Sequence, residues 1–337
     1  MDRKRFAEIA AQFSRLRLLV VGDLMLDEFI WGKVSRISPE APVPVVDVTS
    51  ESYYPGGAAN VARNLRELTG HVAVLGAAGA DEAGARLLAL LEDSGISTAG
   101  VIQHGKCSTI VKTRIIARHQ QVVRVDRDRR MPAAGPHLER AIRFLGGAAA
   151  EVDGIVVSDY DKGFVTQPLA DEILAAARHH GKILAVDPHP HTSLAWNGAT
   201  AIKPNRSEAL HAAGLPPSEA VEPADRDAAL LEAGNRLLER WQPKNLVITL
   251  GEQGMMLFRA GEPCYHVPSC ARDVFDVSGA GDTAIAVFTL GLCAGADARE
   301  AAELANLASG IVVGKLGTAT VTAAELEEAI GRGDSAG

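Results

Sequence analysis

The amino-acid sequence predicts an α/β fold, with a central, mostly parallel sheet flanked by helices and a small antiparallel β lid. Three observations support this prediction. Short apolar runs recur along the chain, segments with helical periodicity separate them, and two stretches interrupt the alternation. Such alternation is typical of a parallel sheet that is covered by helices on both faces.

The expected strands are uninterrupted apolar runs, as is typical of parallel strands that are buried on both faces. They lie at residues 16–23, 71–79, 154–160, 182–188, 199–205 and 245–251. The expected helices lie at residues 57–69, 81–94, 136–149, 166–180, 206–213, 224–241 and 282–295. Before the first strand, apolar residues recur at helical spacing from Phe6 to Leu16, which predicts an amphipathic helix rather than a signal peptide.

Two stretches do not fit a parallel sheet and predict the lid. Residues 28–54 contain three prolines and alternate polar with apolar positions, and residues 107–126 have the pattern of a hairpin that turns near His119. The two stretches can pair above the carboxyl ends of the strands, where open α/β sheets bind ligands. The sequence shows no repeat and no linker, so it predicts one domain over residues 1–337 with an inserted lid.

Composition and charge argue against several kinds of partner. A formal net charge of -8 disfavours binding to nucleic acid. The four cysteines form no disulfide or zinc pattern, which fits a reducing cytoplasm. No apolar run reaches the ~18 residues that a membrane span needs. We therefore expect a cytoplasmic protein without a membrane or nucleic-acid partner.

The heptapeptide DVSGAGD, residues 276–282, predicts a site for an anion. A glycine-rich turn that leads into a helix presents free backbone N–H groups at the positive end of the helix dipole, and these can hold a phosphate. Asp282 stands at the helix start, where its carboxylate can accept a proton from an incoming hydroxyl. Together with Gly279, Ala280 and Gly281, it predicts a phosphoryl-transfer site. The alternative is a capped helix that follows a flexible turn.

A second glycine cluster, in YPGGAANVARN, also opens a helix. Gly56 and Gly57 permit close backbone approach, and Asn60 offers a donor and an acceptor suited to sugar hydroxyls; an ordinary tight turn is the alternative. Asp23 ends a predicted strand, where a carboxylate faces the ligand edge of such a sheet. The alternative for Asp23 is a structural cap.

Polar residues also follow two later strands. Asn205 and Glu208 share one face of a first helical turn, where an amide and a carboxylate can orient waters around Mg²⁺; a plain helix cap is the alternative. Thr249, Gly251 and Gly254 predict either a nucleotide-facing turn or a simple hairpin loop. The histidine pair in DPHPHT lacks a third ligand at a recognisable spacing, so we expect no metal there.

The two glycine motifs resemble the signatures of a known family. DVSGAGD is similar to the C-terminal signature of the ribokinase-like (pfkB) carbohydrate kinases, and PGGAANVARN is similar to their N-terminal signature. The resemblance extends over roughly residues 15–325 and implies a ribokinase-like fold and an ATP-dependent sugar kinase. One position departs from the broad signature, which usually has Thr where this chain has Val277.

The resemblance implies a role for each matching residue. Asp282 corresponds to the catalytic base, and Gly279, Ala280 and Gly281 correspond to the anion hole. The sugar-binding positions are Asp23, Gly56, Gly57 and Asn60. The positions near ATP are Asn205, Glu208, Thr249, Gly251, Gly254 and Asn306, of which Asn205 and Glu208 hold Mg²⁺ through water and Asn306 lies beside the adenine. A K⁺ site behind the anion hole is compatible with Val277.

The resemblance also implies a substrate. Within the family, SDYDKG, RHQQVVRVD and GKLGTATVT are most similar to kinases that act on the C1 hydroxyl of D-glycero-β-D-manno-heptose 7-phosphate. The product of that reaction is the 1,7-bisphosphate, a precursor of ADP-heptose in the synthesis of the lipopolysaccharide inner core. Two alternatives stay open: a kinase of this family for another sugar or a nucleoside, and a non-catalytic sensor of sugar or nucleotide. Retention of Asp282 with the whole anion hole argues against the sensor.

A sugar that carries a distal phosphate must meet positive charge, because burying an unpaired phosphate is very costly. The candidate cations are Lys33, Arg36, Arg114, Arg118 and Lys162, of which the first four lie in the lid. We expect at least one lid arginine to hold the phosphate while the closed lid excludes water.

The lid strands also carry apolar residues, at 115–116 and 122–123, that a monomer would cover poorly. They predict a homodimer that is joined through the lids.

Overall fold

The computed structural model describes residues 1–117, 120–271, 274–315 and 317–334. The strands of its body are β1 (Arg17–Gly22), β4 (His71–Gly79), β5 (Ser97–His104), β8 (Gly154–Ser158), β9 (Ile183–Asp187), β10 (Ala201–Ile202), β11 (Asn245–Thr249), β12 (Met255–Phe258) and β13 (Tyr265–Val267). The helices are α1 (Arg3–Phe13), α2 (Ala58–Arg66), α3 (Glu82–Asp93), α4 (Pro136–Glu151), α5 (Gln167–His179), α6 (Arg206–Ala212), α7 (Ala228–Trp241), α8 (Ala280–Cys293), α9 (Ala298–Val312) and α10 (Ala323–Asp334), with short 3₁₀ turns η1 (Ala224–Arg226) and η2 (Gly251–Gln253). Every expected strand and helix is present, whereas the sequence pattern does not predict β5, β12, β13, α9 or α10.

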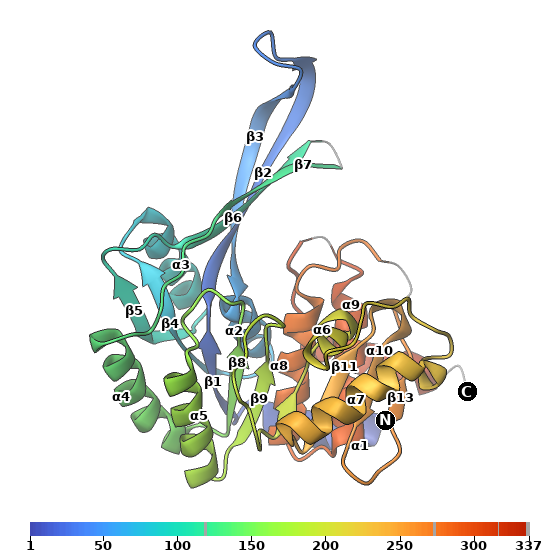
Figure 1. Cartoon of the computed structure of the whole chain (residues 1–337). Helices are drawn as coiled ribbons and strands as arrows, with labels where there is room; N and C mark the ends of the chain where they lie inside the picture. Colours follow the sequence, from blue (N-terminus) through green and yellow to red (C-terminus); the bar gives the residue numbers. More distant parts are fainter. Residues whose placement is uncertain (118–119, 272–273, 316, 335–337) are drawn as a thin grey trace.

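The body is a nine-stranded sheet in the order β13-β12-β11-β10-β9-β8-β1-β4-β5. Neighbouring strands from β11 to β5 are parallel, and β12 and β13 add an antiparallel edge. Figure 1 shows helices on both faces of the sheet. The predicted α/β architecture is therefore confirmed.

Alternate residues of the central strand supply two hydrophobic cores, one on each face of the sheet. Leu18 and Val20 of β1 pack with side chains of α1, α2, α8 and α9. Leu19 and Val21 pack with side chains of α4, α5 and α7. Because successive side chains of a strand point to opposite faces, the apolar run at residues 18–21 of β1 is what a sheet covered on both sides requires.

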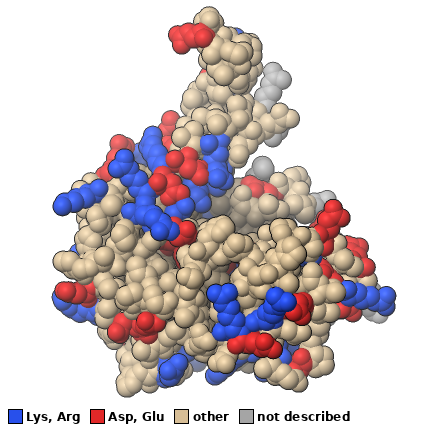
Figure 2. Space-filling model, viewed as in Figure 1, with Lys and Arg blue, Asp and Glu red and all other residues tan. Residues whose placement is uncertain are grey.

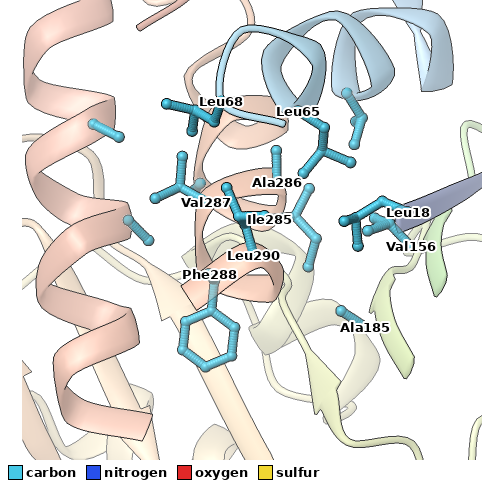
Figure 3. Packing of buried hydrophobic residues seen from close by; sticks show 14 of the residues in the cluster. Leu18, Leu65, Leu68, Val156, Ala185, Ile285, Ala286, Val287, Phe288 and Leu290 are labelled. Atoms are coloured by element: carbon cyan, nitrogen blue, oxygen red, sulfur yellow. The ribbon is translucent and has the colours of Figure 1, made fainter. Parts of the chain in front are cut away.

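Helix α8 is apolar on all sides, and its residues 282–291 are all buried. Figure 3 shows Ile285 and Leu290 of α8 near Leu65, which lies on α2, and near Leu18 and Val156 of the sheet. A helix that is hydrophobic all round belongs in the interior of a protein. This packing fixes the position of the helix start, which carries the glycine-rich motif.

The predicted lid is a second, four-stranded sheet in the order β3-β2-β6-β7. Its strands are β2 (Leu24–Ile37), β3 (Pro44–Gly57), β6 (Ile110–Ala117) and β7 (Gln120–Arg127). Both hairpins are antiparallel, but β2 and β6 join them through parallel pairing. The reason is that β2 and β6 each follow a strand of the parallel sheet, β1 and β5, and leave its carboxyl edge in the same direction. The predicted turn near His119 lies outside the described residues.

Figure 1 shows that β2 and β3 continue beyond the body as a long arm. Within the described part of the chain, no helix combines the length and the apolar character that a membrane crossing requires.

Candidate active site

A cavity of about 410 Å³ lies at the carboxyl ends of the parallel strands, beside the start of α8. Segments that are far apart in the sequence line it: Asp159, Tyr160, Asp187, Pro188, His189, Lys203, Asn205, Glu208, Thr249, Gly279, Gly281 and Asp282. Six of the residues singled out from the sequence therefore meet in one place. This is the edge at which open α/β sheets bind ligands.

Asp282 lies in the first turn of α8 with 6% of its surface exposed. Its Oδ1 accepts a hydrogen bond from the Tyr160 hydroxyl at 2.7 Å, and its Oδ2 accepts one from Asn60 Nδ2 at 2.8 Å. Burial raises the pKa of Asp282 above its usual value, whereas these two hydrogen bonds and the nearby Lys203 ammonium oppose the rise. The carboxylate is thus oriented by two donors and placed to accept a proton.

The glycine-rich turn forms the amino-terminal end of α8. Gly279 has a φ of 82°, and a Cβ on this residue would lie 2.7 Å from Asn60 Nδ2, so this position requires glycine. The N–H of Ala280 donates to the Val277 carbonyl at 3.3 Å. In the described parts of the chain, no acceptor satisfies the N–H groups of Gly281 and Asp282. These two amides point to an anion site at the start of the helix.

The second glycine cluster lies where β3 meets α2. A Cβ on Gly56 would lie 2.4 Å from Asp27 Oδ2, and a Cβ on Gly57, which has a φ of 57°, would lie 2.6 Å from the Asp23 carbonyl oxygen. Gly57 is therefore needed for the backbone to pack closely here, and Gly56 leaves room for the Asp27 carboxylate. Asn60, one turn into α2, reaches Asp282, and its own Oδ1 is buried without a partner among the described residues. That acceptor remains available to a ligand.

Asp23 anchors the loop that carries Tyr160. Its carboxylate accepts hydrogen bonds from the backbone N–H groups of Tyr160, Lys162 and Phe164, at 2.9 to 3.1 Å. Burial raises the pKa of Asp23, and these three amides oppose the rise. The structural alternative for Asp23 therefore describes its present hydrogen bonds, while direct contact with a sugar stays a prediction.

Sequence reasoning missed an ion pair inside the cavity. Lys203 Nζ lies 3.0 Å from Asp187 Oδ2, and only 4% of the Lys203 surface is exposed. Burial raises the pKa of Asp187 to about 7 even though the Lys203 ammonium opposes this rise. A Cβ on Gly281 would lie 3.5 Å from Lys203 Nζ, so the ammonium borders the anion site. One sequence signal could have indicated Asp187 as a site residue, because Asp187 ends an apolar run just as Asp23 does.

Asn205 and Glu208 both line the cavity, and they also close a capping box at the start of α6. Asn205 Oδ1 accepts from the Glu208 N–H at 2.9 Å, and Glu208 Oε2 accepts from the Asn205 N–H at 2.8 Å. The helix-cap alternative thus describes their present hydrogen bonds. In the described ranges, no group of three or more His, Cys, Asp or Glu side chains is arranged to hold a metal ion.

The predicted nucleotide positions separate into two places. Thr249 lines the cavity, and Gly251 and Gly254 follow it in the tight turn of the β11–β12 hairpin, both with positive φ. The hairpin alternative is therefore correct for the local structure. Asn306 lines a different cavity, of about 570 Å³, and its Nδ2 donates to the Pro268 carbonyl at 2.8 Å.

The structure divides the candidate cations for the distal phosphate into inner and outer sets. Arg114 is paired with Asp27, and Lys162 is paired with Asp128, both near the base of the arm. Lys33 and Arg36 are exposed on the outer part of β2. Arg36 is nine residues beyond Asp27 on the same strand, so the two Cα atoms are roughly 30 Å apart. Arg118 lies outside the described residues.

Replacing Tyr160 with Phe tests the geometry around Asp282. The change removes one of two hydrogen bonds that stabilise the carboxylate, so the pKa of Asp282 should rise further. The acid limb of the kcat/KM profile against pH should then move to higher pH by about one unit, because a hydrogen bond to a charged group contributes roughly 1.5–3 kcal/mol.

Tyr53→Phe is the matched control for this change, because the Tyr53 hydroxyl donates to Glu51 on the exposed side of the arm. Its profile should match that of the unchanged protein. An acid limb in Tyr160→Phe at its original position would show that Tyr160 does not orient the base.

A buried carboxylate beside a glycine-rich helix start, in a cavity at the carboxyl edge of a parallel sheet, defines an enzyme that transfers a phosphoryl group to a hydroxyl. The family model described as pfkB family carbohydrate kinase matches residues 15–325. The chain belongs to this family.

Two curated relatives are both named Bifunctional protein HldE. The protein of Geobacter sulfurreducens is 42% identical over 331 residues, which are 98% of this chain and 66% of that protein. The protein of Desulfatibacillum aliphaticivorans is 44% identical over 315 residues, which are 94% of this chain and 63% of that protein. The chain thus spans less than two thirds of the length of these relatives.

Solved structures show the same fold. Phosphofructokinase-2 from Escherichia coli in complex with potassium has a TM-score of 0.73 and 20% identity, and the match covers 94% of this chain and 99% of that one. Ribokinase from Thermotoga maritima has a TM-score of 0.70 and 19% identity with the same coverage. The predicted ribokinase-like fold is confirmed.

Proposed function

We propose that this chain uses ATP to phosphorylate the C1 hydroxyl of D-glycero-β-D-manno-heptose 7-phosphate. The product would be the 1,7-bisphosphate, which leads toward ADP-heptose and the lipopolysaccharide inner core. The single observation that supports a kinase reaction best is the oriented, buried Asp282 next to the unsatisfied amides of the α8 start. The motifs that resemble heptose 7-phosphate kinases, and the 42% identity to HldE proteins, support the substrate.

In the proposed reaction, Asp282 accepts the proton of the sugar hydroxyl as its oxygen attacks the γ-phosphorus of ATP. The new O–P bond forms while the bond between the γ-phosphorus and the β–γ bridging oxygen breaks, and ADP leaves with that electron pair. The N–H groups of Gly281 and Asp282 donate to the oxygens of the transferred group, and the Lys203 ammonium adds positive charge beside them. Asn60 and Tyr160 hold the carboxylate in line throughout.

The cavity also fits the Mg²⁺ that accompanies ATP. Asp187, Asn205 and Glu208 place carboxylate and amide oxygens on its wall, and Mg²⁺ prefers oxygen ligands and retains bound waters. When bound, Mg²⁺ would neutralise charge on the phosphates of ATP. We propose that Asn205 and Glu208 hold it through water, and that Thr249, Gly251, Gly254 and Asn306 contact the nucleotide.

A K⁺ ion behind the anion hole is part of the same proposal. The Thr318 hydroxyl is buried without a hydrogen-bond partner among the described residues, and its methyl group would lie 3.9 Å from a Cβ on Gly279. The unpartnered hydroxyl oxygen of this neighbouring residue is one candidate ligand for the cation. Activity assays in K⁺ and in Na⁺ buffers test it, and equal rates in the two would remove K⁺ from the proposal.

The substrate is tested by measuring ADP release with a panel of acceptors: heptose 7-phosphate, the same heptose without phosphate, ribose, fructose 6-phosphate and a nucleoside. We expect heptose 7-phosphate to give the highest kcat/KM. Equal turnover of the phosphorylated and unphosphorylated heptose would contradict the proposed substrate. Tight binding of a sugar phosphate with no ADP release would instead indicate a sensor.

We also propose that the protein acts in the cytoplasm as a homodimer joined through the lids. Several apolar side chains of the lid are exposed in the single chain: Ile37, Val43, Val48, Val122, Val123 and Val125. Exposed apolar surface of this kind favours association with a partner. Analytical ultracentrifugation should show a dimer at micromolar concentration, and a monomer alone would contradict the lid contact.

A further inference from the structure

The inner face of the lid carries a row of charged side chains opposite the catalytic cavity. In the sheet, Lys112 of β6 pairs in register with Asp27 of β2 and with Asp126 of β7. Arg114, two residues further along β6, lies on the same face, since alternate residues of a strand share a face. Lys112 Nζ lies 5.3 Å from the centroid of the Tyr160 ring, so this face looks toward the residue that holds Asp282.

Most cations around Lys112 already have an acidic partner. The pairs are Arg114 with Asp27, Arg124 with Asp126, Lys162 with Asp128 and Arg130 with Asp161. Figure 2 shows Lys and Arg gathered with Asp and Glu near the base of the arm. Because each pair joins one cation to one carboxylate, the four pairs together carry almost no net charge.

Lys112 is different, because among the described residues it has no carboxylate within ion-pair distance. Its side chain is half-buried, and burial lowers its pKa. The nearby cations Lys162 and Arg114 lower this pKa too, whereas the carboxylates of Asp27 and Asp126 raise it from further away. The face of the Tyr160 ring attracts the ammonium but carries no net charge. A partly desolvated cation without a counter-ion is unfavourable, so Lys112 favours an anion as its ligand.

We propose that Lys112 binds the phosphate group at the end of the sugar that is remote from the reacting hydroxyl, an inference that rests on the proposed function. Lys112 and Asp282 approach the same Tyr160 from its ring face and its hydroxyl end. A sugar phosphate that lies along Tyr160 therefore presents its hydroxyl to Asp282 and its phosphate to Lys112. The phosphate supplies negative charge beside the ammonium, and the ammonium supplies the donors that a phosphate needs.

The proposal is tested with Lys112→Met and Lys112→Arg, each assayed with heptose 7-phosphate and with the same heptose without phosphate. Lys112→Met should raise the KM for heptose 7-phosphate at least about tenfold, because a hydrogen bond to a charged group is lost. It should leave the KM for ATP and the turnover of the unphosphorylated heptose unchanged. Lys112→Arg retains the charge and should keep most of the affinity for heptose 7-phosphate.

The two acceptors separate binding of the phosphate from an effect on the fold, in the manner of a double-mutant cycle. Equal losses with both acceptors, or an unchanged KM for heptose 7-phosphate in Lys112→Met, would overturn the role of Lys112. If the unchanged protein itself turns over both heptoses equally, the proposed substrate fails instead. Lys244→Met is the matched control, because Lys244 is exposed and precedes β11 at the opposite edge of the sheet, so its kinetics should not change.

Discussion

Asp282→Asn is expected to lower kcat at least ~10²-fold with only a modest change in the KM for ATP. Positioned acid and base groups contribute about this factor, and the amide cannot accept the proton of the sugar hydroxyl. The fold should persist, because Asn60 can turn its unpartnered Oδ1 toward the new amide. The measurement is steady-state ADP release with saturating sugar phosphate, together with a thermal melt of each protein.

Asp153→Asn is the matched control for this experiment. Asp153 precedes β8 at the amino edge of the sheet, where its Oδ2 accepts from the Arg17 N–H at 2.8 Å. The Asp153→Asn variant should keep the full kcat of the unchanged protein. A kcat for Asp282→Asn within a few-fold of the unchanged protein would mean that another group accepts the proton.

Lys203→Met is expected to reduce the free energy of unfolding by about 3–5 kcal/mol, the usual cost of breaking a buried ion pair by removing one partner. Both side chains are largely buried, so solvent screens little of their attraction. The remaining Asp187 would take up a proton, because its pKa, already raised to about 7 by burial, loses the cation that holds it down. Urea denaturation at pH 8 without ligands measures the loss.

The stability of Lys203→Met should also depend more strongly on pH. A carboxyl group with a raised folded-state pKa stabilises the fold below its unfolded pKa, and this contribution is lost as the pH rises through the folded value. The free energy of unfolding of Lys203→Met should therefore decrease as the pH rises from about 4 to a point above 7. The double variant Asp187→Asn with Lys203→Met should recover much of the stability, since no unpaired charge remains. If Lys203→Met unfolds at the same urea concentration as the unchanged protein, the pair does not contribute as described.

Local pattern was sufficient to predict the strands that are buried on both faces. β1, β8 and β9 each contain an unbroken apolar run, which is typical of parallel strands that are buried on both faces. Two elements were harder to predict from the sequence. β5 has exposed positions at both ends, and α9 begins with the capping box of Asp297 and Glu300, a signal that the apolar periodicity alone does not include.

The residues of the candidate site also include some that local sequence pattern predicts and some that it does not. Gly279 and Asp282 belong to one short motif, so their chemistry could be predicted from neighbours in the sequence. Tyr160, Asp187 and Lys203 come from separate strand ends, and their partnership depends on which strands lie side by side in the sheet. Lys112 depends further on the parallel joining of β2 to β6, which the sequence pattern did not predict.

Strand β1 ends at Gly22 and β2 begins at Leu24, so Asp23 is the one residue between this strand of the body and the first strand of the arm. The carboxylate of this connecting residue also carries the loop of Tyr160. We therefore expect any displacement of the start of β2 to be transmitted through Asp23 to the loop of Tyr160, the residue that donates to Asp282. We thus expect sugar binding at the arm and the orientation of the Asp282 carboxylate to be coupled through this one residue.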